Sequence, residues 1–220
     1  MLCSKLRERL QALSPALLAD ARSRLELPEK HLDPNIRPFT PFISMIGAAV
    51  TVKLGIAENK ASADLTRMLE AYESQTEPGV IMVIEVPTEL HSYGIFGDGA
   101  ATIARKHGFL GVLVEGAVRD TPDLQKMDFP AFSRTIAPGY IIGKASVLDT
   151  HGPVMVGGQT IDQGDVIVAD NDGVIVIPPQ ELEKNISHAE SIKKWEEQVH
   201  KLYEEGGSSK DIATQVGPLP

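Results

Sequence analysis

Residues 97–120 read GDGAATIARKHGFLGVLVEGAVRD, and this stretch decides the fold that the sequence predicts. Its first half predicts a helix over 98–107, because small and apolar residues follow a glycine-flanked aspartate and Gly108 is a natural stop. Its second half predicts a short buried strand over 111–114. The apolar run from Val80 to Val86 predicts another buried strand before the helix. Strand, helix and strand in this order form a βαβ unit, so the two strands should be parallel and joined by a right-handed crossover.

The segment before this unit predicts two helices and one further strand. Residues 14–26 have a helical pattern that Ser14 caps and Pro15 begins. Residues 49–56 alternate apolar with other residues, as a half-buried strand does. Ser62 then caps a second helix with an apolar stripe. The sequence therefore predicts an α/β fold.

The segment after this unit predicts strands first and a long helix last. One strand is expected at 129–133, and short apolar runs between glycine turns follow at 147, 154–156, 160–161, 166–168 and 174–177. Asp172-Gly173 lies between the last two runs and predicts a hairpin. Residues 180–205 predict a charged helix, and residues 206–220 are expected to be loose or to reach a neighbouring molecule. No linker is visible, so we expect a single domain, 1–220, with a helical C-terminal extension from residue 180.

The composition restricts the class of protein. The formal net charge of −9 argues against a nucleic-acid surface, which needs a basic patch to neutralise phosphates. The single cysteine, Cys3, has no partner for an internal disulfide, which fits a reducing compartment. No apolar stretch is long enough to span a bilayer. We therefore expect a cytoplasmic protein that binds neither nucleic acid nor membrane.

Three charged residues lie at the ends of the predicted elements: Asp98 begins the helix, and Arg119 and Asp120 follow the strand. Ligands in open α/β sheets bind outside the carboxyl ends of the strands. Asp120 offers a hard oxygen ligand suited to Mg²⁺ or Mn²⁺, which often uses only one or two carboxylates. Arg119 offers a planar fork for a carboxylate or an enolate. The combination predicts an enzyme that acts on small oxo acids.

A purely structural interpretation of these residues stands beside the functional one. Asp98 is a favoured N-cap residue, and Asp120 or Thr121 could cap a helix that starts near Pro122, with Arg119 left in solvent. In the functional interpretation, the amides of Gly99, Ala100 and Ala101 bind a substrate carboxylate, and the Asp98 side chain turns toward metal-bound water. Spacing alone leaves both interpretations open.

The central block resembles a known family. Gly97-Asp98 through Gly108, the run from Gly111 to Arg119-Asp120, and Phe129-Pro130-Ala131-Phe132 are similar to the regulator-of-ribonuclease-activity-A family. That family includes the 4-hydroxy-4-methyl-2-oxoglutarate aldolases, also called 4-carboxy-4-hydroxy-2-oxoadipate aldolases. The aldolase signature is an acidic residue, twenty intervening positions and then Arg-Asp, which Asp98 and Arg119-Asp120 satisfy. One departure is Gly55-Ile56-Ala57-Glu58-Asn59, where many members have a Pro-Gly-Asp-Asn run.

The resemblance implies a role for each residue. It implies that Asp120 binds a divalent metal, Mg²⁺ or Mn²⁺, that Arg119 contacts the substrate, and that the stretch Gly97, Asp98, Gly99 and Ala100 holds the substrate carboxylate. It implies an α/β/β sandwich of the swivelling-domain type, assembled as trimers or as hexamers made of two trimers, with sites near subunit interfaces. The C-terminal helix could then supply a carboxylate to a neighbour's site, from among Glu196, Glu197, Glu204 and Glu205.

The implied reaction is a metal-dependent retro-aldol cleavage of a 2-oxo acid to pyruvate, with Asp98 holding the water that acts as base. Oxaloacetate decarboxylation passes through the same pyruvate enolate and is the expected second activity. Two other functions stay open on the sequence. The acidic chain could be a binding protein that masks a basic segment of a ribonuclease, or it could be a lyase or decarboxylase of another oxo acid.

Overall fold

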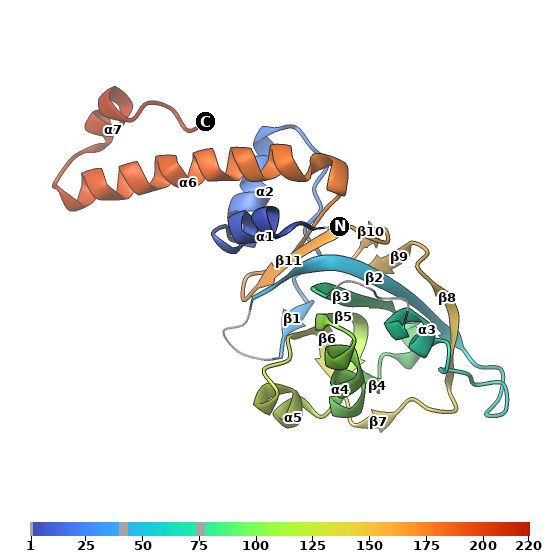
Figure 1. Cartoon of the computed structure of the whole chain (residues 1–220). Coiled ribbons are helices and arrows are strands. Elements are labelled where there is room, and N and C mark those ends of the chain that lie inside the picture. The colour runs from blue at the N-terminus through green and yellow to red at the C-terminus, as the bar shows by residue number, and fades with distance from the viewer. Residues whose placement is uncertain (1, 40–43, 74–77) are drawn as a thin grey trace.

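A mixed β-sheet forms the centre of the computed structural model, which describes residues 2–39, 44–73 and 78–220. The strand order along the sheet is β1-β6-β5-β3-β2-β11-β12, with β4 and β8 paired to β5 and β2 and with β7 paired to β4 (Figure 1). The strands are β1 (Arg37–Pro38), β2 (Met45–Ile56), β3 (Val80–Glu85), β4 (Tyr93–Phe96), β5 (Phe109–Val118), β6 (Ala131–Ile136), β7 (Gly139–Tyr140), β8 (Ala145–Thr150), β11 (Val166–Asp170) and β12 (Gly173–Ile177). A separate hairpin consists of β9 (Val154–Val156) and β10 (Gln159–Ile161).

The predicted βαβ unit is confirmed. β3 and β5 are parallel neighbours in register from Ile81↔Gly111 to Ile84↔Val114, and α4 (Asp98–Lys106) connects them after the short strand β4. Gly108 ends the helix with a φ of 81°, a backbone conformation that favours glycine. A Cβ at this position would also lie only 2.9 Å from the Pro78 backbone, so both the conformation and the packing require glycine. Strand β5 is longer than predicted and continues to Val118, which brings its end beside β4.

The sheet is covered on both faces. Helices α3 (Met68–Glu73), α4 and α5 (Thr121–Lys126) pack on one face, in a core with Met82, Ile84, Val112 and Val114. The β9–β10 hairpin covers the other face, against Ile81, Val83 and Leu113. The alternation of these side chains along β3 and β5 explains why both strands read as continuous apolar runs.

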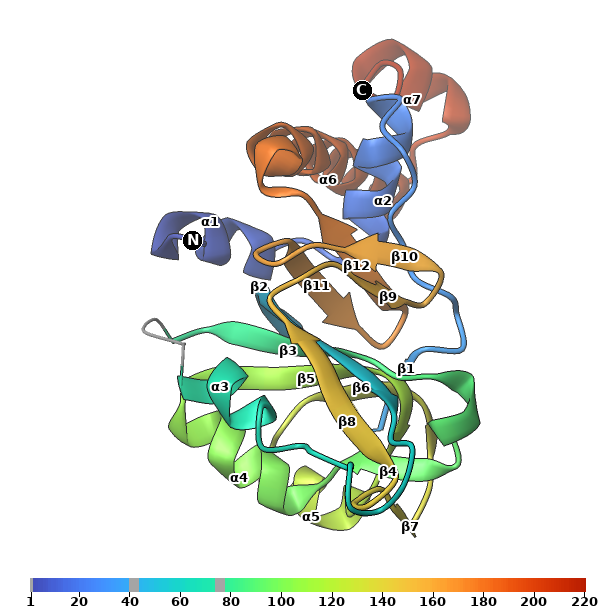
Figure 2. The same ribbon diagram turned by 90° about the vertical axis from the view of Figure 1, so that its right-hand side faces the viewer.

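A helical layer packs at the far end of the sheet, over β11 and β12 (Figure 2). It consists of α1 (Ser4–Gln11), α2 (Pro15–Arg24) and the first half of α6 (Leu182–Glu204). The remainder of α6 extends away from the sheet, and α7 (Ser209–Gln215) folds back along it, where the Trp195 indole donates to the Gly217 carbonyl at 3.0 Å (Figure 1). In the described part of the chain, no helix has both the length and the apolarity to cross a membrane.

Most predicted elements are confirmed, including α2 with its Ser14 cap, the β11–β12 hairpin at Asp172, and α6 after the short 3₁₀ helix Pro179–Glu181. The predicted start of the second helix is wrong. Ser62 does not cap a helix: its hydroxyl donates to the Asn59 carbonyl in a turn, and α3 begins only at Met68. The turn wins because the Asn59 side chain also accepts the amides of Ala61 and Ser62, which is the local bonding that favours asparagine in turns.

Among the described residues, the elements that were not predicted include α1, β1, β4, β7 and α7. Helix α7 contradicts the expectation of a loose tail, because Ser208 and Asp211 form a capping box at its start. Helix α1 is held by Arg7, whose guanidinium donates to the carbonyls of Ile46 and Gly79 at 2.6 and 2.8 Å. The mixed α/β class is confirmed.

Candidate functional site

Asp98, Arg119 and Asp120 come together where β4, β5 and β6 end. The Arg119 amide donates to the Phe96 carbonyl at 2.9 Å, and the Ala137 amide donates to the Val118 carbonyl at 3.0 Å. These two bonds place the residue after β5 directly beside Gly97, the residue before α4. The prediction that Asp98 and Arg119-Asp120 lie at the same edge of the sheet is therefore confirmed.

Two glycines make room for the Arg119 side chain. A Cβ on Gly97 would lie 2.8 Å from Arg119 Cγ and closer still to Asp120 Oδ2. A Cβ on Gly94 would lie 2.6 Å from Arg119 Cβ and 2.6 Å from the Ala137 carbonyl oxygen. Any side chain at either position would displace the arginine stem. The sequence did not indicate Gly94 as a functional position, because its contact with Arg119 arises only where β4 pairs with the end of β5.

Arg119 and Asp120 form an ion pair with each other. Arg119 Nε donates to Asp120 Oδ1 and Oδ2 at 3.2 and 3.0 Å. The side chains are 33% and 28% exposed, so both are accessible to a ligand. Within the described residues, the two terminal guanidinium nitrogens of Arg119 have no hydrogen-bond partner, which leaves one edge of the fork open for an anionic ligand.

Asp120 occupies the cap position of α5 without using its carboxylate as a cap. Its backbone has a φ of 54° and a ψ of 35°, the left-handed region that aspartate tolerates better than most residues. Its carbonyl accepts the amides of Asp123 and Leu124 at 3.0 Å each, while its side chain makes no capping bond. The main chain of Asp120 thus takes the N-cap position, as the purely structural interpretation predicted. Its carboxylate does not cap the helix and pairs with Arg119 instead.

Asp98 is the first residue of α4, and Gly97 is the N-cap, so the expectation that Asp98 caps the helix is wrong. Asp98 Oδ1 accepts the Gly99 amide at 2.7 Å, and Oδ2 has no protein donor among the described residues. The Ala101 amide donates to the Gly97 carbonyl at 2.9 Å. Three amides, those of Gly99, Ala100 and Ala101, were expected to bind a substrate carboxylate. Of the three, only the Ala100 amide has no hydrogen-bond partner among the described residues and can donate to a ligand. The space beside Gly99 is open to at least 4 Å, which gives a ligand access to this helix end.

A divalent metal fits this arrangement only with a sparse set of protein ligands. In the described parts of the chain, no cluster of three or more His, Cys, Asp or Glu side chains could hold a metal ion. Asp120 offers one carboxylate, held where a Gly97 side chain would otherwise stand. A carboxylate has about four lone-pair sites, so it can accept from Arg119 and still bind an ion. Mg²⁺ commonly keeps several waters and takes one or two carboxylates, so the residues fit Mg²⁺ and do not fit a zinc cage.

The C-terminal carboxylates do not join this site within one chain. The second half of α6, which holds Glu196, Glu197 and Glu204, extends away from the sheet on the side far from α4 (Figure 1). A cavity of about 320 Å³ lies between α2 and the β11–β12 turn, and neither Asp98, Arg119 nor Asp120 lines it. The candidate site of the single chain is therefore Arg119, Asp120 and the first turn of α4.

Comparisons with known proteins agree on the family. A family model described as "RraA-like: Aldolase/RraA" matches residues 16–176. A putative 4-hydroxy-4-methyl-2-oxoglutarate aldolase of Halalkalibacterium halodurans is 33% identical over 161 residues, which cover 72% of this chain and 71% of that protein. A protein of Dechloromonas aromatica with the same name is 29% identical over 148 residues, covering 67% of this chain and 89% of that protein.

Solved structures share the fold at low sequence identity. An uncharacterized protein from Pseudomonas syringae pv. tomato matches with a TM-score of 0.81 at 21% identity, over 96% of this chain and 97% of the other. The Streptomyces coelicolor protein RraAS2, described as an unusual member of the RNase ES inhibitor RraA protein family, matches with a TM-score of 0.78 at 22% identity, over 90% of this chain and 96% of the other. The family model covers most of the chain and the structural likeness covers nearly all of it, so this protein belongs to the RraA-like (Aldolase/RraA) family.

Proposed function

We propose that this protein is a divalent-metal-dependent pyruvate aldolase that cleaves 2-oxo acids of the 4-hydroxy-4-methyl-2-oxoglutarate type. The observation that carries the proposal is the pairing of Arg119 and Asp120 beside the start of α4, with the outer edge of the guanidinium open. A cationic fork, a hard oxygen ligand and a helix N-terminus suit a substrate that carries a carboxylate next to a keto group. The names of the two curated relatives support the same chemistry.

Each residue has a distinct task in this reaction. Asp120 would hold the divalent ion, Mg²⁺ or Mn²⁺, which when bound would polarise the keto oxygen of the substrate. The free edge of Arg119 would bind and orient the anionic oxygens of the pyruvoyl half. The amide of Ala100 would donate to the substrate carboxylate at the N-terminus of α4. Asp98 Oδ2, which has no protein donor among the described residues, would orient a water that accepts the proton of the C4 hydroxyl.

The bond changes then follow from these positions. Loss of the hydroxyl proton turns C4 into a carbonyl carbon, the C3–C4 bond breaks, and its electron pair moves to C3 and gives the enolate of pyruvate. Arg119 donates to the developing enolate oxygen, an interaction commonly worth about 3–4 kcal/mol when the donor is well placed. Protonation of C3 completes pyruvate. Loss of carbon dioxide from oxaloacetate gives the same enolate, so we propose oxaloacetate decarboxylation as a second activity.

The test is an assay for pyruvate coupled to lactate dehydrogenase, with 4-hydroxy-4-methyl-2-oxoglutarate and oxaloacetate as substrates. Pyruvate should form with Mg²⁺ or Mn²⁺, and EDTA should abolish its formation. Equal rates with metal and with EDTA would exclude the role of the metal. Full activity of an Asp120→Ala variant would exclude the assignment of the site.

Two other functions from the sequence remain distinguishable by experiment. RraAS2 is described as a member of an RNase-inhibitor family, and its likeness to this chain shows the fold alone. A ribonuclease-binding protein would be captured by an immobilised ribonuclease and would form no pyruvate from either substrate. A lyase or decarboxylase of another oxo acid would be inactive on the two named substrates but would release product from a wider panel of 2-oxo acids.

The higher-order features belong to the same proposal. We propose a trimer or a hexamer of two trimers, a swivelling-domain variant of the α/β fold, and a cytoplasmic enzyme that binds neither nucleic acid nor membrane. The net charge of −9 supports the absence of a nucleic-acid partner. The exposed far half of α6 is consistent with a contact to another subunit, where Glu196, Glu197, Glu204 or Glu205 could approach a second site. Light scattering of the purified protein measures the oligomeric state.

A further inference from the structure

Strand β5 contains one extra residue shortly before the candidate site. In its pairing with β6, Val114 lies opposite Ser133 and Ala117 lies opposite Thr135. Two residues of β5, 115 and 116, thus lie opposite one residue of β6, Arg134, which defines a β-bulge at residues 115–116. Beyond the bulge, β5 pairs with β4, the strand that leads into α4. The bulge therefore lies where the strand turns toward the site.

The extra residue sets how far along the sheet Arg119 lies. Leu113 packs toward the β9–β10 hairpin, and the Glu115 carboxylate contacts the same hairpin. Val112, Val114 and Val118 belong to the core on the other face. Relative to β6, the extra residue leaves every later residue of β5 one position short, about 3.3 Å along the strand. It thus sets where β5 ends and where Arg119 lies against Gly94 and Gly97.

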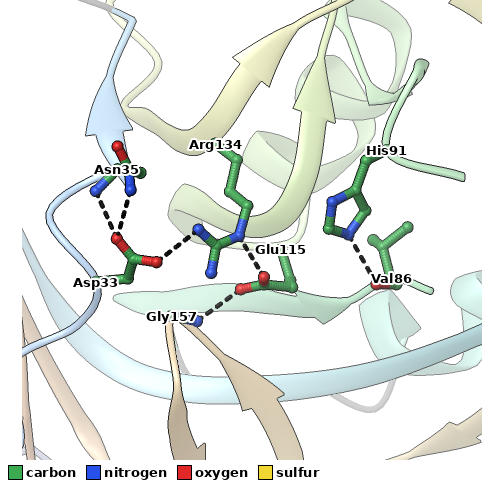
Figure 3. Close-up of polar contacts among 7 residues, drawn as sticks. All are labelled: Asp33, Asn35, Val86, His91, Glu115, Arg134 and Gly157. Atoms are coloured by element: carbon green, nitrogen blue, oxygen red, sulfur yellow. Dashed lines mark hydrogen bonds and ion pairs between the residues drawn. The ribbon is translucent and has the colours of Figure 1, made fainter. Parts of the chain in front are cut away.

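A polar cluster spans the bulge (Figure 3). Glu115 is on the bulge, and Arg134 is the β6 residue between the two paired positions, directly opposite it. Arg134 Nε donates to Glu115 Oε1, and Arg134 Nη1 donates to Asp33 Oδ2 at 2.8 Å. The other Glu115 oxygen, Oε2, accepts the Gly157 amide at 2.6 Å. The Glu115 and Arg134 side chains are only 16% and 23% exposed, so this pair is shielded better than a surface ion pair.

We propose that Glu115 and Arg134 are positioning residues of the site: their ion pair across the bulge holds the one-residue register shift that sets where Arg119 lies beside α4. This inference rests on the proposed function for its kinetic consequence but on the strand register for its structural basis. Neither residue has to touch the substrate. Without the charge pair, the bulged segment loses its ion pair to β6, so the segment that carries Arg119 can shift.

Glu85 provides a matched control on the neighbouring strand β3. It is 20% exposed and pairs with Lys53 at 2.9 Å. Its Oε2 accepts the Met155 amide of the same hairpin at 2.7 Å. Glu85 therefore shares the residue type, the exposure, the cationic partner and the hairpin contact of Glu115. It differs from Glu115 because β3 and β5 are in regular register over 81–84, because β3 does not carry Arg119, and because its partner is a lysine that is 43% exposed.

The experiment compares Glu115→Gln with Glu85→Gln in the pyruvate assay and in thermal melts. Both variants should lose similar, small amounts of stability. Glu115→Gln should lower kcat/KM by about 10- to 100-fold, the range expected when a catalytic group moves by up to about 1 Å. Glu85→Gln should stay within about twofold of wild type, as for a substitution away from the site. Arg134→Lys, which keeps a cation opposite Glu115, should lose less activity than Arg134→Met. Equal losses from Glu115→Gln and Glu85→Gln would overturn the proposal.

A second readout separates positioning through Arg119 from a general loss of structure. In an Arg119→Lys background, Glu115→Gln should cause at most about a twofold further loss, because residues that act as one unit are not additive. The same fold-loss in both backgrounds would show that Glu115 acts independently of Arg119, against the proposal.

Crystal structures of the wild type and of Glu115→Gln complete the test without activity. The proposal expects Arg119 Cγ to have moved away from Gly97 in the variant, and an unmoved Arg119 would overturn it. If the wild type forms no pyruvate, the proposed function fails, and this structural comparison still decides whether the ion pair positions Arg119.

Discussion

Replacement of Gly97 by alanine is the most direct test of how closely the site is packed. The new methyl carbon would lie 2.8 Å from Arg119 Cγ. Carbon atoms pack best at about 3.5–4.0 Å, so the arginine stem would have to retreat by about 1 Å. The backbone conformation at Gly97 allows alanine, because a φ of −141° and a ψ of −166° are ordinary extended values. The effect of the substitution is therefore the displacement of Arg119 and of the Asp120 carboxylate beside it.

The expected result is a large loss of activity with a moderate loss of stability. A misplacement of about 1 Å can lower the rate by about 100-fold, so kcat/KM for pyruvate formation should fall by that factor. Overpacking by one methyl group costs about 1–3 kcal/mol, measured by urea denaturation. The loss should be at the lower end of that range, because the Arg119 side chain is 33% exposed and has room to move.

Gly111→Ala is the matched control, since it overpacks β5, the strand that precedes Arg119, away from the site. Its methyl carbon would lie 2.5 Å from Met45 Sδ and 2.7 Å from the Pro130 carbonyl oxygen. This variant should lose at least as much stability as Gly97→Ala, yet the folded protein should retain its specific activity. If Gly97→Ala keeps full activity, or if both variants lose activity in proportion to stability, the inferred close packing around Arg119 is wrong.

Three further predictions concern single side chains. Asp120→Asn should lower kcat by about 100-fold or more and leave Tm nearly unchanged in a thermal melt, because asparagine tolerates the φ of 54°. Tyr72→Phe should leave stability to urea unchanged or raise it by about 1 kcal/mol, since the buried hydroxyl has no hydrogen-bond partner among the described residues. Hydrogen bonds from Arg9 lower the pKa of Glu190 below its ordinary value of 4.5, so this pair stabilises the fold above pH 4.5 and the effect disappears as the pH falls through the lower folded value. The Tm difference between wild type and Arg9→Met should therefore be largest near neutral pH and shrink in acid, and a pH-independent difference would contradict this assignment.

The sequence by itself determined the local elements and the chemistry-bearing residues. The apolar run of β3, the helix from Asp98 to Gly108 and the strand after it could be recognised because periodicity, capping and glycine stops act over a few neighbouring residues. Parallel pairing of the two strands then followed from the length of the connection. This reasoning also placed Asp98 and Arg119 at one rim of the sheet.

Only the tertiary structure decided how these residues face one another. The bulge at 115–116 exists only in the pairing of β5 with β6, and it sets how far along the sheet Arg119 lies. Gly94 acquires its role because β4 is brought beside the end of β5, and Arg134 because it lies opposite Glu115. A strand's periodicity is local, whereas its register and irregularities depend on contacts between residues far apart in the chain, so the side-chain directions in the site could not be derived from the sequence alone.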